Sequence, residues 1–217
     1  MSTTFTQEEI QQWSDMMDSK WKEALVDLSD NGGWDFVKQQ SNCTAYKKHV
    51  ANDPHMKIKG GGSIKTDMSA KEFLDWFLNQ FEHVEKRKII DPMCNFREKI
   101  ASLNEDLSIY HMQYDSPAVL VSCRDSICLY KNYQESNKFY IIGVSVEHPS
   151  FPKPAKKYVR MNNKINAFSI EKKVDGDIEV WNVSHLDPCG NIPSWLSSGQ
   201  ECMTFILKLK DILDGRK

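Results

Sequence analysis

The first part of the chain repeats apolar residues every three or four positions, which is the spacing of one face of an α-helix. The stripe consists of Ile10, Trp13, Met17, Trp21, Ala24 and Leu28. Thr6 and Glu9 stand just before it with the spacing of a capping box, in which two side chains satisfy the backbone N–H groups at a helix start. Asn31-Gly32-Gly33 favours its end. The pattern predicts an amphipathic helix of about five turns.

Short runs rich in β-branched and aromatic residues predict strands at 34–38, 44–50, 56–65, 108–114, 123–133, 139–146, 158–171 and 178–186. Gly60-Gly61-Gly62 interrupts the third run and indicates a bulge or a close backbone approach. Between the third and fourth runs, Ser69 and Glu72 form a second capping box. It precedes a stripe of aromatic residues, so we expect a middle helix to about residue 80, and Asp91-Pro92 closes this helical part.

A third helical stripe ends the chain, from about residue 194 to residue 213. It consists of Trp195, Gly199, Cys202, Ile206, Leu209 and Leu213, widened by Leu196, Met203 and Leu207. A stripe this wide predicts a helix that lies on an apolar surface. We therefore expect one α+β domain over residues 1–217, with a curved antiparallel sheet of about nine strands around the long C-terminal helix. Such a sheet can enclose an apolar cavity between itself and the helix.

Charge and cysteine content narrow the class of function. The chain of 217 residues has 28 Lys and Arg against 30 Asp and Glu, which does not favour nucleic acid as a partner. No apolar run reaches the ~20 residues of a membrane span, and residues 1–10 lack the pattern of a signal peptide. The six cysteines include no Cys-x-x-Cys pair, which is typical of reduced thiols, so we expect a cytoplasmic protein.

Three segments, in order, resemble the START (steroidogenic acute regulatory-related lipid transfer) domain family. The first is Cys123-Arg124-Asp125-Ser126-Ile127, an Arg-Asp strand start. The second is Ser145-Val146-Glu147-His148-Pro149 followed by Tyr158-Val159-Arg160. The third is Asp187-Pro188-Cys189-Gly190-Asn191-Ile192-Pro193-Ser194-Trp195-Leu196, before the last helix. The resemblance covers roughly residues 34–214. It departs at Ile90 and Ser126, where the family often has aromatic residues.

The resemblance implies a helix-grip fold in which the last helix and a nearby loop cover a lipid tunnel. That loop would be 115–122, with Val119 and Leu120 near its tip, and Met203 and Ile206 would lie at the tunnel mouth. Sterol-carrying relatives keep an acid and an arginine at the positions of His111 and Tyr130. If both residues face inward, the polar set is His111, Gln113 and Tyr130, which suits a neutral lipid such as a sterol. Alternatively, His111 and Tyr130 satisfy each other within the wall.

Other polar residues have simpler interpretations. His185 and Cys189 lie close in sequence, yet the cysteine belongs to a turn that the family uses structurally, so catalysis is disfavoured. Cys123 and Cys128, with His111, are poor candidates for a shared metal ion, because cysteines five positions apart on a strand face opposite sides of the sheet. Arg124 and Asp125 fit structural pairing within the sheet or with Arg160 and Asp187. Two basic clusters, Lys153, Lys156, Lys157 and Arg160, and Lys208, Lys210, Arg216 and Lys217, suit membrane docking or a solvated face.

Three functions remain from the sequence. The first is intracellular lipid binding and transfer by a monomer, with transient membrane contact, no covalent step and no cofactor or metal. The second is a lipid-sensing regulatory module whose lid recruits a protein when occupied. The third is a helix-grip enzyme, a cyclase or hydrolase acting on a bound acyl or polyketide chain.

Overall fold

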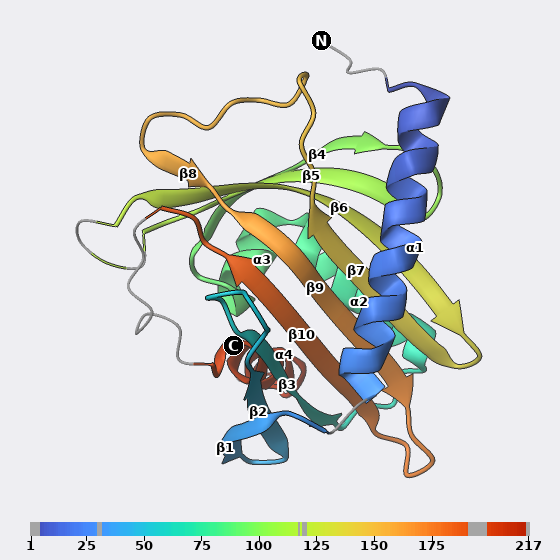
Figure 1. Cartoon of the computed structure of the whole chain (residues 1–217). Coiled ribbons are helices and arrows are strands. Elements are labelled where there is room, and N and C mark those ends of the chain that lie inside the picture. Colours follow the sequence, from blue (N-terminus) through green and yellow to red (C-terminus); the bar gives the residue numbers. More distant parts are fainter. Residues whose placement is uncertain (1–4, 30–31, 117, 119–120, 191–198, 216–217) are drawn as a thin grey trace.

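A computed structural model describes residues 5–29, 32–116, 118, 121–190 and 199–215 (Figure 1). The helices are α1 (Gln7–Ser29), α2 (Ala70–Glu82), α3 (Val84–Ile90) and α4 (Glu201–Leu213). The strands are β1 (Asp35–Gln40), β2 (Cys43–Lys48), β3 (Lys57–Ile64), β4 (Cys94–Ser102), β5 (Leu107–Tyr114), β6 (Cys123–Glu135), β7 (Lys138–Ser145), β8 (Tyr158–Arg160), β9 (Asn162–Lys172) and β10 (Ile178–Asp187).

The strands form a single curved sheet in the order β1-β2-β3-β10-β9-β7-β6-β5-β4, with β8 paired to β6. Neighbours along this path are antiparallel, while β8 runs parallel to β6. The predicted antiparallel sheet with a C-terminal helix is confirmed. Two details differ from the prediction. β4 was not among the predicted strands, and the expected strand 158–171 is divided at Met161 into β8 and β9.

One face of the sheet, called here the α1 face, is covered by α1. The predicted capping box forms, because Thr6 and Glu9 exchange hydrogen bonds of 2.7 and 3.2 Å. Met17 and Ala24 are fully buried against strand residues such as Ile127 and Ile142. Helix and strands therefore share one hydrophobic core, and the apolar stripe read from the sequence is its helical half.

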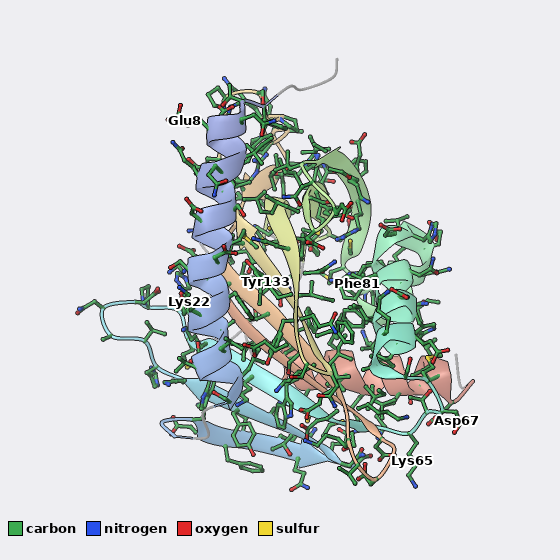
Figure 2. All side chains as sticks on the ribbon, turned by 90° about the vertical axis from the view of Figure 1, so that its right-hand side faces the viewer. Glu8, Lys22, Lys65, Asp67, Phe81 and Tyr133 are labelled. Carbon is green, nitrogen blue, oxygen red and sulfur yellow. The ribbon has the colours of Figure 1, made fainter. Side chains whose placement is uncertain are left out.

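The opposite face, called here the α4 face, carries α2, α3 and α4. Figure 2 shows α1 and α2 on opposite sides of the sheet, with Phe81 on the α2 side. A second core joins apolar residues of α2 and α4 to alternate residues of the strands, including Phe77, Phe168, Ile170 and Ile206. The residues of each strand alternate between the two faces, so one sheet supplies two separate cores.

Gly60 explains how closely α4 lies on the sheet. β3 continues through all three glycines and pairs without a register shift to β2 and β10, so there is no bulge. A Cβ atom on Gly60 would overlap the backbone of Cys202 and Met203 in α4. The glycine is therefore needed for close approach, one of the two possibilities that the sequence left open.

The predicted start of the last helix, near residue 194, lies outside the described residues, and α4 is described from Glu201. Gly199, just before it, has a φ of +74° and lies near Val37 of β1. A short helix, α3, also follows α2 where only the end of a helical part was expected. None of the described helices combines the length and apolar character needed to cross a membrane.

Candidate functional site

Two pockets lie between the α4 face of the sheet and the helices that cover it. The β5 pocket, of about 180 Å³, is lined by residues of α2, β4, β5 and β6 together with Phe168 of β9. The α4 pocket, of about 360 Å³, is lined by residues of α3, α4, β9 and β10, and by residues 91–93. Part of each lining belongs to the second hydrophobic core, and the rest is largely polar or charged. Both pockets therefore border the second hydrophobic core.

Arg87 brings a charge into the α4 pocket. Although it is only 7% exposed, its Nε and Nη1 atoms have no hydrogen-bond partner among the described residues. Its Nη2 atom donates to Asp91 at 3.1 Å. Burial disfavours the charge, but Asp91, together with Tyr114, Cys94 and Tyr130, outweighs it and holds the pKa of Arg87 above its ordinary value. A permanent cation with spare donors is therefore held in an apolar setting.

Arg97 and Tyr130 are two of the polar residues that line the β5 pocket, beside Glu82, Lys99, Glu105, Asp106, Ser108 and Asn132. The Arg97 guanidinium lies 4.0 Å from the centre of the Tyr110 ring and 5.5 Å from that of Tyr130. Its buried Nε atom also lacks a partner in the described part of the chain. Burial raises the pKa of Tyr130 to about 12, so the phenol stays neutral. The Tyr130 hydroxyl has a weak contact of 3.9 Å to the Met112 sulfur, and its ring fills the space that a Gly143 Cβ would occupy.

His111 and Tyr130 lie on opposite faces of the sheet, contrary to the expected shared inward wall. The β5–β6 register pairs His111 with Ile127 and Ser108 with Tyr130, without a shift. His111 therefore shares the α1 face with Ile127, and its Nε2 atom hydrogen-bonds to Asp125. Gln113 lies two positions after His111 on the same strand, so its side chain is also on the α1 face. Neither the shared polar set nor mutual satisfaction of His111 and Tyr130 occurs.

The other expected ligand-binding residues have different positions. Met203 and Ile206 are almost completely buried in the second core, but they line neither the β5 pocket nor the α4 pocket. The α4 residues that line the α4 pocket are Glu201, Cys202, Thr204, Phe205 and Lys208. Val119 and Leu120 lie outside the described residues. Of the seven expected residues, Tyr130 is the one that the described structure places against the β5 or the α4 pocket.

Arg124 and Asp125 have structural partners. Arg124 donates to the carbonyl oxygens of Pro188 and Cys189 at 2.6 and 2.9 Å, and to that of Ser122. It thus fastens the turn before α4 to the start of β6. Asp125 is fully buried and pairs with Arg160 and His111. The expected partner Arg160 is confirmed, whereas Arg124 bonds to backbone carbonyls next to Asp187 rather than to its carboxylate.

The candidate catalytic and metal groups are poorly suited to those roles. Burial and the neighbouring Asp187 raise the pKa of the Cys189 thiol, the opposite of what a nucleophile needs. His185 directs its Nε2 atom to Asp53, at 3.2 Å, and to the His55 carbonyl, at 3.1 Å. No group of three or more His, Cys, Asp or Glu residues suited to a metal ion occurs within the described ranges.

Arg87, Arg97 and Phe205 were missed by the sequence reasoning. A signal for Arg87 was present, because it stands three positions before Ile90 and so shares the buried face of a helix. Arg97 gave no comparable signal, since the alternation of β4 is broken by register shifts near Phe96 and Ala101. Phe205 lies beside the apolar stripe rather than in it.

A curved antiparallel sheet that grips a C-terminal helix, with pockets between the two, defines the helix-grip class of α+β proteins. The START domain family model matches residues 13–208, and the chain belongs to this family. No sequence among curated proteins matches it.

Solved structures show the same fold at low sequence identity. The human StAR-related lipid transfer protein 5 is similar with a TM-score of 0.78 at 19% identity, covering 94% of this chain and 97% of that one. Human STARD10 has a TM-score of 0.74 at 18% identity, with 92% and 82% covered. The lipid transfer and protein localization domain of human StarD13 has a TM-score of 0.67 at 18% identity, with 96% and 98% covered.

Proposed function

We propose that this protein binds one lipid between the α4 face and its covering helices, and transfers it between membranes without a covalent step. The observation that carries the proposal is the buried Arg87 guanidinium, with two unpartnered nitrogens in a pocket of the apolar core. Buried donors nearly always have an acceptor in a native protein, so these groups favour a ligand that supplies one. Two similar solved structures are named as lipid transfer proteins or domains, which supports the same function.

The apolar side chains that line the α4 pocket would enclose the acyl tail of the lipid. Enclosing one methylene contributes about 0.8 kcal/mol, so affinity grows with the length of chain that the protein covers. Phe168 and Phe205 line the α4 pocket together with Ile58 and Ile90. An enclosed cavity that joins both pockets is part of this proposal, because neither pocket alone is large.

The head group that fits Arg87 and Arg97 offers several hydrogen-bond acceptors. The sequence favoured a neutral lipid because His111, Gln113 and Tyr130 were expected to form an uncharged polar set. In the structure, Tyr130 lies on the opposite face of the sheet from the other two. A phosphodiester supplies both acceptors and the negative charge that a guanidinium favours. We therefore propose a phosphate-bearing lipid first. A neutral lipid such as a sterol is the second candidate, supported by the neutral Tyr130 hydroxyl in the β5 pocket.

The setting of this activity is proposed as well. One domain over residues 1–217, acting as a cytoplasmic monomer, would meet membranes transiently through α4 and the 115–122 connection. In the lipid-sensing alternative, the protein binds the same lipid but acts by recruiting a protein partner. The enzyme alternative needs turnover of the bound compound.

The test is native mass spectrometry of the purified protein after incubation with vesicles of equal phosphatidylcholine, diacylglycerol and cholesterol. We expect a one-to-one complex, with phosphatidylcholine preferred. Arg87→Met should reduce that preference, because it removes the charge and the spare donors. Lys86→Met, on an exposed position of the same helix, is the matched control and should bind as the wild type does.

A lipid-transfer assay between vesicles distinguishes the three candidate functions. Movement of labelled phosphatidylcholine from donor to acceptor vesicles supports transfer. Binding without movement points to sensing, and chemical change of the bound lipid points to an enzyme. A folded wild-type protein that takes up none of the three lipids would refute the proposed function.

A further inference from the structure

Four phenylalanine rings from three elements meet between the helices and the sheet. Phe77 and Phe81 come from α2, Phe168 from β9 and Phe205 from α4. Each ring contacts the other three, with centroids between 4.4 and 6.2 Å apart. Figure 2 shows Phe81 between α2 and the sheet. We call these residues the phenylalanine cluster.

The phenylalanine cluster stands between the two pockets. Phe77, Phe81 and Phe168 line the β5 pocket, while Phe168 and Phe205 line the α4 pocket. Arg87 of the α4 pocket and Arg97 of the β5 pocket both face the Phe81 ring, at 4.2 and 5.9 Å from its centre. The rings therefore form a partition that has one pocket on each side, unlike phenylalanines that merely fill a core.

The sizes of the pockets make the partition important. Ligand pockets usually span ~300–1,000 Å³, and the β5 pocket, at about 180 Å³, falls below that range. The α4 pocket, at about 360 Å³, lies near its lower end. A lipid with a long chain needs both volumes, and it obtains them only if one ring leaves the cluster.

We propose that the phenylalanine cluster is an internal gate, that Phe205 is the ring that moves, and that Phe205 and Phe168 set the longest chain the protein encloses. The inference rests on the proposed lipid binding and adds to it the element that decides chain length. Opening joins the β5 and α4 pockets into one chamber, and closure divides them.

Phe205 is the ring best placed to move. It is half-buried, whereas Phe77, Phe81 and Phe168 are at most 6% exposed. Phe168 is held in a central strand, paired on one side with Ile141 and on the other with Asn182. Without Phe205, the other three rings still contact one another at 4.4, 5.1 and 6.0 Å. Its departure therefore leaves the rest of the core packed.

The experiment compares wild type with Phe205→Ala, which removes the moving ring, and Phe205→Trp, which thickens the partition. Phe139→Ala is the matched control, because Phe139 is buried in the same core but lines neither the β5 pocket nor the α4 pocket. Each protein is incubated with vesicles containing phosphatidylcholines that differ only in acyl length. Native mass spectrometry then gives the length distribution of the bound lipid, and circular dichroism verifies the fold.

We expect Phe205→Ala to shift the bound lipid toward longer chains, by about fourfold in affinity for each further methylene enclosed. Phe205→Trp should shift it toward shorter chains, and Phe139→Ala should match the wild type. A wild type that carries lipid, with Phe205 variants of unchanged length distribution, overturns the gate and leaves the proposed function intact. A wild type that carries no lipid overturns both.

Discussion

Tyr130 shows how one residue can be held by packing while its polar atom stays available. The ring fits because Gly143 has no side chain: an added Cβ would come within 2.6 Å of Tyr130 Cε1. The hydroxyl, in contrast, has a long contact to the Met112 sulfur and lies beside the Arg97 guanidinium. Packing therefore fixes the orientation of the phenol, and the hydroxyl remains able to bond to a ligand.

Replacing Tyr130 by Phe should separate these two roles. We expect the free energy of unfolding to change by less than about 1 kcal/mol, since the lost hydrogen bond to sulfur is weak. Affinity for a lipid that bonds to the hydroxyl should fall by roughly 0.5–1.5 kcal/mol. Urea unfolding and lipid titration measure the two quantities. A variant that loses stability but keeps its affinity would show that the hydroxyl serves the fold instead.

His185 provides a pH-dependent contribution to stability. Burial lowers its pKa, Asp53 and the His55 carbonyl oppose this, and Lys164 and Lys57 add to it. The folded protein therefore binds fewer protons than the unfolded chain around the ordinary histidine pKa. Stability from this residue is present above pH ~6.5 and is lost as the pH falls through the lowered folded value.

The corresponding measurement is urea unfolding at a series of pH values from neutral to mildly acidic. One such histidine contributes a slope of at most about 1.4 kcal/mol per pH unit. His185→Gln keeps a polar group but cannot titrate, so its stability should depend less on pH in this window. Equal slopes for the two proteins would exclude His185 as the source.

At the level of elements, the contact between α4 and β3 depends on Gly60. In Gly60→Ala the new methyl group meets helix backbone, which cannot rotate away as a flexible side chain can. We expect a loss of about 1–3 kcal/mol, the usual cost of overpacking. Alanine itself favours a strand over glycine, so any measured loss understates the clash.

Thermal unfolding of Gly60→Ala, compared with Ser63→Ala on the same strand, tests this contact. Ser63 pairs with Glu179 in the sheet, and its backbone carbonyl oxygen accepts a hydrogen bond from the Asn42 side chain, so the Ser63 side chain can be shortened with little effect. Equal melting temperatures for the two variants would show that α4 does not depend on its close approach to Gly60 of β3.

Elements with strong local signals were predictable, and those that depend on distant pairing were not. α1 and α2 carry capping boxes and clear apolar stripes, so their starts follow from the sequence. α3 has seven residues, too few to show a period. The faces of His111 and Tyr130 follow from the β5–β6 register, which is set by pairing across the sheet rather than by either strand alone. That is why the fold was predictable while most of the expected binding residues were not.

For the whole molecule, we expect transfer rather than binding to depend on salt. Basic residues near an anionic surface contribute about 1 kcal/mol each, and salt screens them. The residues concerned are Lys153, Lys156 and Lys157 before β8, and Lys208 and Lys210 on α4. Transfer to anionic vesicles should slow at high ionic strength, and uptake from neutral vesicles should hardly change. Salt-independent transfer would mean that these lysines play no part in docking.

The alternation of the strands between two cores has a consequence for how such a protein can diverge. In β6, Ile127 and Leu129 belong to the core under α1, whereas Tyr130 faces the β5 pocket. A substitution at a pocket-facing position therefore alters what the protein accommodates, while its neighbours keep the α1 core intact. New ligand preferences are accessible by single steps that do not pass through an unfolded protein. A shared fold at 18–19% identity is the outcome that such a division allows.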